Sequence, residues 1–385
     1  MFSEREGFFV DLTKTKKYTK IVSAKFSTEL RNGGLAVTTG NGKILVVLTG
    51  GTIGSTCSDG VREIEGDSPY ILIREFREKC PEYAGCELEV VNPCSILSEN
   101  LTCDVWNTLY KALNSVDTAA YDGIIMTHGS DTLAYTAAAM GMLLRHTECP
   151  IVLTAADRPV NDPKSNAIPN FRSSVDFILA GGMKGVFVSY RRNADGAQTI
   201  YLATRLLSAD CFSDEFSSYD GGCFGTVKDG RFIPSLSQVN PLPDSFRRKL
   251  PPIAGENVDL GEKKVMLLRS YPGMEYAAVD PRGFAAVVNY GYHCATACTV
   301  GENTSLLSFA GRCRECGVPL WLGSFKRTES EIYSTQAEMD ELGIRRFYDM
   351  SPEAAYVKAV LAYNLPVKNP DEFMSECVFY EMISQ

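Results

Sequence analysis

The chain has 385 residues, of which 45% are hydrophobic and 22% charged, so it is long and apolar enough to form two folded domains. Its formal net charge of −9 argues against a general affinity for nucleic acid or anionic membranes, because a phosphate surface would be repelled. The first residues lack the apolar core of a secretory signal, and no stretch approaches the roughly 18 apolar residues of a membrane span. We therefore expect a cytoplasmic protein with no nucleic-acid or membrane partner, whose thirteen cysteines are reduced thiols.

The first predicted strand covers residues 44–48 (ILVVL), and a glycine-rich segment, residues 49–54 (TGGTIG), follows it directly. Five apolar residues in a row are typical of a strand buried on both faces of a parallel sheet, and the glycines allow a sharp turn. Ligands of open α/β sheets bind outside the carboxyl ends of the strands, so the hydroxyl of Thr52 is a candidate for chemistry. The alternatives are a turn with a structural threonine or, more weakly, a nucleotide-binding loop, although the G-x-G-x-x-G spacing and the P-loop lysine are missing.

A second strand of the same design is predicted at residues 123–126 (GIIM), followed by residues 127–132 (THGSDT) and by a helix over residues 133–144. Ser130 and Asp131 then lie at a strand-to-helix turn, where backbone N–H groups and the positive end of the helix favour an anion such as a substrate carboxylate. Thr52 and Ser130 are therefore expected to face one crevice.

The two segments TGGTIG and THGSDTLAYTAAA together resemble the asparaginase/glutaminase family of amidohydrolases. Residues 98–102 (SENLT) with Trp106 resemble the substrate-binding serine segment of that family, and residues 151–159 (IVLTAADRP) resemble its next strand and loop. The likeness runs from about Lys43 to at least Phe216 and, more faintly, to about Tyr363. It implies hydrolysis of the side-chain amide of L-asparagine to L-aspartate and ammonia, with no metal and no cofactor.

The resemblance also implies roles for the two strand-end loops. An amide is a poor electrophile, so its cleavage needs an activated hydroxyl, a proton acceptor and donors for the oxyanion. Thr52 takes the role of the nucleophile, and Ser130 that of the second hydroxyl, where the family usually has threonine. Asp131 would orient Ser130 and hold the ammonium group of the substrate.

Substrate binding is expected from Gly51, Ser98 and Glu99, with Ser130 and Asp131. By resemblance, Ser98 and Glu99 would bind the α-carboxylate and the α-ammonium of the amino acid. The alternative for this pair is a helix N-cap, because serine and acidic residues commonly precede helices.

The lysine of the family has no clear counterpart in this chain. It follows a threonine in a loop beyond the strand predicted at residues 185–190, where Thr204 and Arg205 stand here, while Lys164 and Lys184 match less well. A guanidinium cannot be deprotonated in a protein, so Arg205 could lend charge but could not shuttle a proton. The lid tyrosine is also missing from residues 58–62 (SDGVR), and Tyr70 could take its place only if the lid is longer. A weakened or non-catalytic amino-acid sensor or partner subunit, and an amidase for glutamine or a modified amide, therefore remain alternatives.

Strands and helices alternate along most of the chain, which predicts parallel βαβ units and a doubly wound, mostly parallel α/β sheet. We expect an N-terminal extension at residues 1–40, a catalytic domain at 41–233, a proline-rich linker at 234–262 and a second, smaller α/β domain at 263–385. The resemblance implies a homodimer or homotetramer whose site is completed by a neighbouring C-terminal domain, from residues 301–303 or 328–331.

The cysteines and histidines leave two other chemistries to consider. The pairs Cys294/Cys298 and Cys313/Cys316 approximate four-thiolate zinc spacing, but a helix that ends before Gly317 explains the second pair equally well. A serine-protease-like triad would need His128, which stands two residues before Ser130 on the same loop. Its expected duty is instead to anchor that loop by a hydrogen bond.

Overall fold

The computed structural model describes residues 41–383 except residues 55, 59–60, 64–67 and 328–332. The predicted N-terminal extension, residues 1–40, lies outside the described residues, and so does the candidate subunit-completing segment 328–331.

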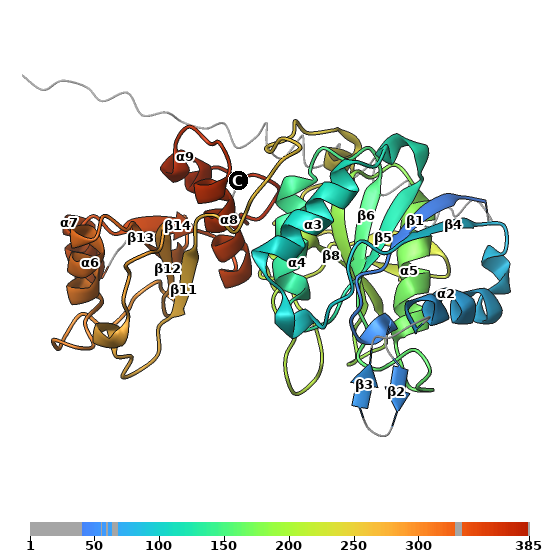
Figure 1. Ribbon diagram of the computed structural model, residues 1–385, viewed down its shortest axis with the longest axis horizontal. Helices are drawn as coiled ribbons and strands as arrows, with labels where there is room; N and C mark the ends of the chain where they lie inside the picture. The colour runs from blue at the N-terminus through green and yellow to red at the C-terminus, as the bar shows by residue number, and fades with distance from the viewer. Residues whose placement is uncertain (1–40, 55, 59–60, 64–67, 328–332, 384–385) are drawn as a thin grey trace, which may run out of the picture.

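The larger sheet has the strand order β10-β9-β8-β7-β6-β5-β1-β4 (Figure 1). Five neighbouring strands, β4, β1, β5, β6 and β7, are parallel to one another. The remaining strands, β8, β9 and β10, each run antiparallel to the strand before them. The bounds are β1 (Lys43–Val47), β4 (Glu87–Val91), β5 (Gly123–Thr127), β6 (Pro150–Thr154), β7 (Gly185–Arg191), β8 (Gln198–Leu202), β9 (Gly225–Lys228) and β10 (Arg231–Pro234).

A second, smaller sheet follows later in the chain, and its described strands are all parallel. They are β11 (Val265–Arg269), β12 (Ala286–Tyr290), β13 (Leu320–Phe325) and β14 (Arg345–Tyr348). Two short strands, β2 (Thr56–Ser58) and β3 (Val61–Glu63), pair as a separate antiparallel hairpin. The predicted fold class, a mostly parallel α/β sheet with a second and smaller α/β unit, is confirmed.

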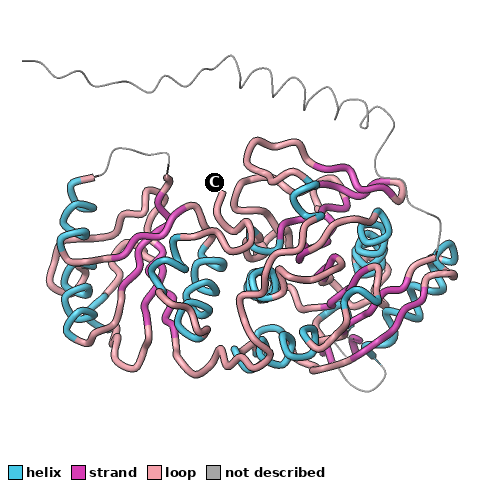
Figure 2. The backbone as a smooth tube through the Cα atoms, turned by 90° about the horizontal axis from the view of Figure 1, so that it is seen from above, coloured by secondary structure: helices cyan, strands magenta, loops and turns pink. Residues whose placement is uncertain are grey.

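Helices cover both faces of each sheet (Figures 1 and 2). On the larger sheet, one face packs against α2 (Ser68–Lys79) and α5 (Ala167–Ala180), and the other against α3 (Cys103–Asn114) and α4 (Leu133–Leu143). The smaller sheet is flanked by α6 (Leu306–Glu315) and α7 (Ser334–Glu341) on one side and α8 (Pro352–Asn364) on the other. The helix α9 (Pro370–Ser375) packs on α8.

Short 3-10 helices occupy several of the connections. They are η1 (Thr52–Gly54), η2 (Pro81–Tyr83), η3 (Ser98–Asn100), η4 (Thr118–Ala120), η5 (Ala203–Arg205), η6 (Pro243–Arg247) and η7 (Tyr276–Ala278). Three of them, η1, η3 and η5, carry residues singled out by the sequence.

The buried strand β1 explains why its end is held rigidly. Ile44 and Val46 pack into the core on the α5 side, whereas Leu45 and Val47 pack into the core on the α4 side. Strand side chains alternate between faces, so an unbroken apolar run fills both cores at once. The loop that follows β1 therefore starts from a fixed point.

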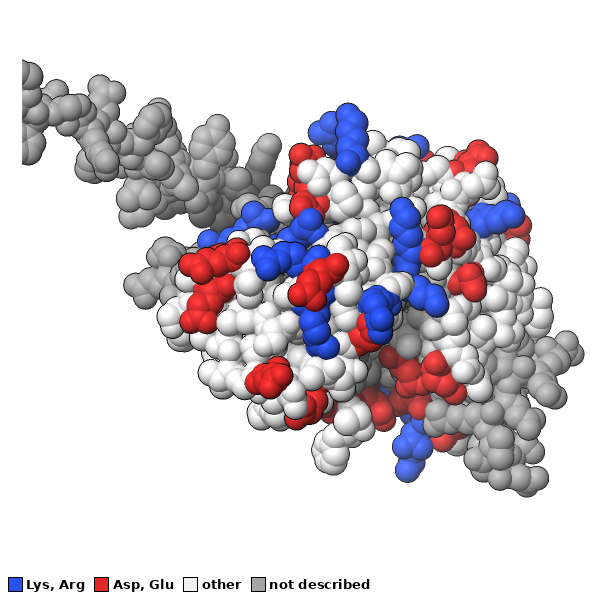
Figure 3. Space-filling view, turned by 60° about the vertical axis from the view of Figure 1, so that its left-hand side comes forward, with Lys and Arg blue, Asp and Glu red and all other residues white. Residues whose placement is uncertain are grey.

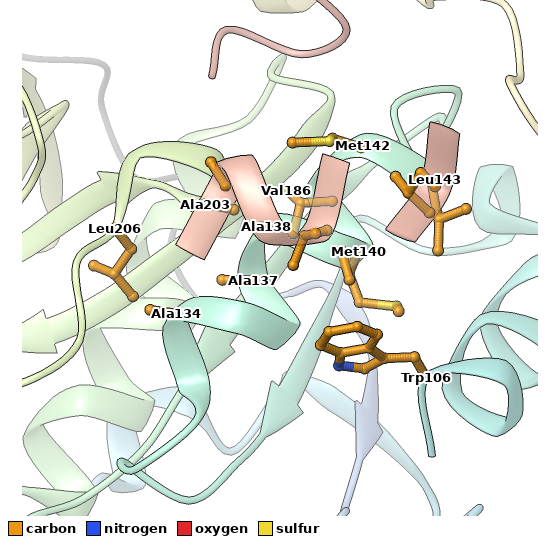
Figure 4. Close-up of a cluster of buried hydrophobic side chains, with 14 of the residues drawn as sticks. Trp106, Ala134, Ala137, Ala138, Met140, Met142, Leu143, Val186, Ala203 and Leu206 are labelled. Atoms are coloured by element: carbon orange, nitrogen blue, oxygen red, sulfur yellow. The ribbon is translucent and has the colours of Figure 1, made fainter. Parts of the chain in front are cut away.

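The helix α4 is buried almost all round because its alanines allow close packing. It lies between the larger sheet and α8, and Figure 4 shows Ala134, Ala137 and Ala138 of this helix with Met140 beside Trp106. The indole N–H of Trp106 also donates to Thr136 Oγ1 at 3.1 Å. The N-terminal end of α4 is thereby fixed at the same sheet edge as the end of β1.

The end of the chain returns to the first sheet after α9. Thr204 Oγ1 donates to the carbonyl of Phe379 at 2.6 Å, and Arg145 donates to the carbonyl of Val378 at 2.7 Å. The ammonium of Lys358 lies 2.6 Å from Glu381, and both side chains are fully buried. We call residues 376–382, together with the side chains that hold them, the C-terminal clamp.

The described surface carries both signs of charge. On the face turned forward in Figure 3, Lys and Arg side chains are interspersed with Asp and Glu. Within the described part of the chain, no helix has the length and apolar character needed to cross a bilayer.

Candidate active site

The loops that carry the two predicted hydroxyls touch each other at Gly51 and Gly129. These glycines directly precede Thr52 and Ser130. A Cβ atom built on Gly51 would lie 2.4 Å from the backbone nitrogen of Gly129, and one built on Gly129 would lie 3.5 Å from the Cα of Gly51. Only glycine allows such an approach, and Gly51 also has a φ of +77°. Thr52 and Ser130 follow these two glycines, so their side chains leave from adjoining backbones.

Hydrogen bonds lock the two loops at the carboxyl edge of the sheet. The hydroxyl of Thr49 donates to the carbonyl of Thr127 at 2.6 Å, and the N–H of Thr49 donates to Thr127 Oγ1 at 3.2 Å. The N–H of His128 donates to the carbonyl of Thr154 at 2.8 Å. The ends of β1, β5 and β6 are thus tied together, which gives the loops beyond them a preorganised geometry.

Ser98 enters the same group from the connection after β4. A Cβ atom on Gly129 would lie 2.3 Å from Ser98 Oγ, which places the buried hydroxyl directly on the second loop. Ser98 Oγ donates to Asp131 Oδ2 at 3.3 Å, and Thr132 Oγ1 donates to the carbonyl of Ser98 at 2.8 Å. Glu99 is exposed beside Ser98 in η3.

The helix N-cap alternative for Ser98 is wrong. The residue before α3 is Thr102, four positions further along, and Ser98 itself begins the separate turn η3. Its hydroxyl is committed to Asp131 rather than to a helix N–H group. Ser98 is therefore part of the loop cluster.

The electrostatics of this cluster suit a zwitterion. Asp131 is exposed and Ser130 is half-buried, and both stand just before the first turn of α4. The N–H groups and the positive end of that helix favour an anion, whereas the carboxylate of Asp131 favours a cation. An amino acid carries both charges, so the cluster is chemically suited to hold one.

His128 anchors the second loop, as expected. It is buried, and its ring atom Nδ1 lies 2.8 Å from the carbonyl oxygen of Gly129, so Nδ1 carries the proton and donates it. Burial lowers the pKa of this imidazole, which keeps it neutral. Nε2 is buried without a hydrogen bond to the described residues.

Arg205 is not brought to this cluster. The methyl group of Thr204, its neighbour, lies 2.7 Å from a Cβ atom built on Gly141, near the C-terminal end of α4. That point is eight residues, or about 12 Å, from the first residue of the helix. The strand β8 also runs antiparallel to β7, so Arg205 lies toward the opposite edge of the sheet from Thr52.

The guanidinium of Arg205 serves the C-terminal clamp instead. It donates to the carbonyls of Tyr380 at 2.5 Å, Met382 at 3.0 Å and Val239 at 2.8 Å, and pairs with Asp220 at 3.2 Å. Arg205 and Asp220 are 1% and 2% exposed. Burial lowers the pKa of Arg205, against the opposing effect of Asp220. All three guanidinium nitrogens of Arg205 therefore have protein partners away from the loop cluster.

Lys184 and Lys164, the other candidates for the lysine of the family, are not placed beside the loop cluster by any contact of the described residues. Lys184 lies just before β7, toward the opposite edge, and pairs with Glu148 at 2.7 Å. Lys164 is exposed on the connection between β6 and α5. Tyr70, the conditional candidate for a lid tyrosine, lies in the first turn of α2 and is 47% exposed.

Sequence reasoning missed two charged residues at the site edge. Asp157 follows β6, Arg191 ends β7, and Arg191 Nη2 lies 4.0 Å from Asp157 Oδ2. Their side chains are 11% and 29% exposed. A signal was present, because Arg191 directly follows a predicted strand and Asp157 lies in the loop after another, on the edge where Thr52 and Ser130 are expected.

The zinc alternative gains no support from the described residues. Among them, no three or more His, Cys, Asp or Glu side chains are grouped so that they could hold a metal ion. Cys313 is buried within α6, and Cys316 follows the last residue of that helix. The cysteines whose side chains are described are all free thiols.

A family model described as "Asparaginase, N-terminal" matches residues 43–236, about half of the chain. The chain is 29% identical over 330 residues to a glutamyl-tRNA(Gln) amidotransferase subunit of Aeropyrum pernix, covering 82% of this chain and 73% of that protein. It is 27% identical over 333 residues to the corresponding amidotransferase subunit of Pyrococcus abyssi, covering 82% and 70% respectively.

Solved structures share the fold. The thermostable L-asparaginase from Thermococcus kodakarensis superposes with a TM-score of 0.70 at 23% identity, covering 89% of this chain and 100% of that chain. L-asparaginase I from Vibrio cholerae gives a TM-score of 0.68 at 20% identity, covering 89% and 99%. The loop motifs, their meeting at one sheet edge and the match of the family model lead to one conclusion: the chain belongs to the asparaginase family.

Proposed function

We propose that the protein hydrolyses the side-chain amide of L-asparagine to L-aspartate and ammonia, with Thr52 as the nucleophile. The observation that carries this proposal is the backbone contact of Gly51 with Gly129, the residues that directly precede Thr52 and Ser130. Two hydroxyls and a carboxylate in one place are what amide cleavage without a metal requires.

The proposed reaction has two steps. Thr52 Oγ1 attacks the amide carbon, the new C–O bond forms, the C–N bond breaks, and the hydroxyl proton leaves with the ammonia. Water then attacks the acyl-enzyme, the C–O bond to Thr52 breaks, and a proton returns to its hydroxyl as L-aspartate leaves. Ser130 takes the role of the second hydroxyl, which flanks the amide from the other loop.

Substrate binding is proposed for the exposed side of the same cluster. Asp131 and Glu99 would hold the α-ammonium, and the N-terminal end of α4 would favour the α-carboxylate. Ser98 fixes Asp131 by its hydrogen bond. Gly51 would contribute through its backbone, because Gly129 occupies the space that a side chain on Gly51 would fill.

Glutamine is a second candidate substrate, because one methylene contributes only about 1–3 kcal/mol of discrimination. The similarity to amidotransferase subunits, at 29% identity in one case, favours a related role. In that role the protein would release ammonia from an amide donor for a partner subunit. A binder without turnover is the remaining alternative, since Arg205 supplies no cation to the site.

A steady-state ammonia assay on the purified protein tests these candidates. L-asparagine, L-glutamine and their D-forms are the substrates, and Thr52→Ala is the control. Ammonia release from L-asparagine that disappears in the variant supports the proposal. A rise of the melting temperature with L-asparagine, without ammonia release, would instead indicate the non-catalytic binder.

We also propose that the protein is a cytoplasmic homodimer or homotetramer, in which residues 301–303 of a neighbouring copy approach the site. Multi-angle light scattering at micromolar concentration tests this directly. A monomer with full activity would contradict the need for a second copy.

A further inference from the structure

The ends of five parallel strands form a row along the carboxyl edge of the larger sheet. In the order β4, β1, β5, β6 and β7, the residues at or beyond their ends are Ser98, Thr52, Ser130, Asp157 and Arg191. The amino-acid end of a substrate belongs at the Ser98 side of this row, and the scissile amide between Thr52 and Ser130. Asp157 and Arg191 therefore lie beyond the amide end.

The spacing allows Arg191 to reach that position. Neighbouring strands are about 4.8 Å apart, so β7 is about 10 Å from β5. The side chain of Arg191 already extends toward β5, because its Nη2 lies 4.0 Å from Asp157 Oδ2, beyond the intervening strand β6. Thr127 pairs with Thr154, and Thr154 with Ser189, which precedes Arg191 by two residues. Ser130 and Arg191 thus both leave the sheet just above the same level.

Two buried asparagines of the α5 segment hold the pair in place. Asn170 accepts from the N–H of Arg191 at 2.8 Å and donates to the carbonyl of Ala155 at 2.9 Å, which ties the ends of β7 and β6 together. Asn166 and Asp157 exchange two hydrogen bonds, at 2.9 and 3.1 Å. Such support keeps charged groups in a fixed geometry before any substrate binds.

The guanidinium of Arg191 keeps free donors. Its contact with Asp157, at 4.0 Å, is at the limit of an ion pair, and its side chain makes no hydrogen bond to the described residues. It has five N–H donors in a planar fork. This is the reverse of Arg205, whose three guanidinium nitrogens all bond to protein groups, two of them to carbonyls of the C-terminal clamp.

We propose that Arg191 supplies the fixed positive charge at the amide end of the site and stabilises the oxyanion that forms on hydroxyl attack, with Asp157 as its positioning residue. This inference rests on the proposed function for its chemistry. It assigns to Arg191 the charge that the family motif placed on Arg205, without any proton transfer through the guanidinium.

The kinetic test compares Arg191→Met, Arg191→Lys and Asp157→Asn with wild type. Loss of a preorganised oxyanion donor lowers kcat by about 10²–10³-fold. We expect that loss in Arg191→Met with little change in KM, about tenfold recovery in Arg191→Lys, and a smaller loss in Asp157→Asn. Arg192→Gln is the matched control, because Arg192 is the next residue and pairs with Asp195 on the hairpin. Melting temperatures confirm that each variant folds.

A binding test separates the charge from the proposed reaction. On a Thr52→Ala background, calorimetry compares L-aspartate, whose side-chain carboxylate imitates the oxyanion, with L-asparagine, whose amide is neutral. Arg191→Met should lower the affinity for L-aspartate by about tenfold or more and the affinity for L-asparagine far less, because hydrogen bonds between charged groups are stronger than those to neutral groups.

Each result decides one or both proposals. If wild type releases ammonia and Arg191→Met behaves like Arg192→Gln, the role of Arg191 is overturned while the amidohydrolase stands. If wild type releases no ammonia but the preference for L-aspartate depends on Arg191, the proposed reaction fails while the charge assignment stands. If neither turnover nor ligand preference depends on Arg191, and wild type is inert, both are overturned.

Discussion

The carboxyl edge of the larger sheet and the C-terminal clamp use the same kinds of side chain in opposite ways. In the clamp, Arg205, Lys358 and Glu381 are almost fully buried and directed to fixed partners. At the strand ends, Asp131 is exposed and Arg191 keeps unused donors. A charge whose partners are complete holds the fold together, whereas a charge left open beside a hydroxyl is available to a substrate.

The comparison explains why the position named by the family motif does not supply the cation. Arg205 stands in the right stretch of sequence, but the tail takes its donors through contacts 175 and 177 residues away. The charge needed at the site is then expected from a residue on the correct edge. Arg191 meets that condition.

The largest expected effect is on turnover. Thr52→Ala should reduce kcat by on the order of 10⁴–10⁶-fold, as loss of a nucleophile does in other hydrolases, while the free energy of unfolding changes little. Thr52→Ser keeps the hydroxyl and should keep much of the rate. Ammonia release followed by coupled assay measures both, and undiminished turnover in Thr52→Ala would remove Thr52 from the mechanism.

The next largest effect is on stability and sharpens the contrast with the clamp. Lys358→Met leaves the carboxylate of Glu381 buried without its cation, which should cost about 3–5 kcal/mol of unfolding free energy. Although burial acts to raise the pKa of Glu381, Lys358 and two backbone N–H groups lower it overall. Chemical denaturation measures the loss. The control Lys184→Met breaks a partly exposed pair of similar length and should leave the midpoint almost unchanged.

A smaller effect is expected from closing the gap between the two loops. Gly51→Ala places a Cβ atom 2.4 Å from Gly129 and strains a φ of +77°, so about 1–3 kcal/mol and most of the activity should be lost. Gly196→Ala shares a positive φ but meets nothing within 4 Å. That control should lose some stability and keep its activity. Equal activities in the two variants would show that the close approach is not needed.

The smallest effect is a pH dependence from His128. Burial lowers the pKa of this imidazole in the folded state, so below the unfolded value of about 6.5 the unfolded chain binds a proton that the folded chain does not. The contribution of His128 to the free energy of unfolding is therefore complete above about pH 6.5, and it is lost as the pH falls toward the lower pKa of the folded state. The free energy of unfolding then changes by at most about 1.4 kcal/mol per pH unit.

His128→Asn can still donate to the carbonyl of Gly129 but cannot titrate, so it should show a shallower loss of unfolding free energy between pH 6.5 and 5. His146 contributes to the same window, because burial lowers its pKa as well. Identical slopes in wild type and variant would assign the whole dependence to other groups.

Much of the fold was predictable because its central strands are continuous apolar runs. The strands β1, β5, β6 and β7 are buried on both faces, and such runs stand out in sequence. The edge strand β4 alternates between half-buried and exposed residues, and β14 carries Arg345 and Arg346, so neither gives a comparable signal. Edge strands need to fill only one core.

The candidate site was predictable where it depends on strand ends. Parallel strands bring their carboxyl ends to one edge, so the contact between the loops that carry Thr52 and Ser130 follows from two local patterns. The surroundings of Arg205 depend on a tail that returns after α9, and no local pattern records that contact. Asp157 and Arg191 were visible as residues, but their pairing required the order of β6 and β7.

A crystal structure with L-aspartate bound tests the central claim most directly. We expect the side-chain carboxylate of the ligand within hydrogen-bond distance of Thr52 Oγ1 and Ser130 Oγ, its ammonium beside Asp131, and Arg191 facing the carboxylate. A ligand bound elsewhere, or one that draws the guanidinium of Arg205 out of the C-terminal clamp, would contradict it.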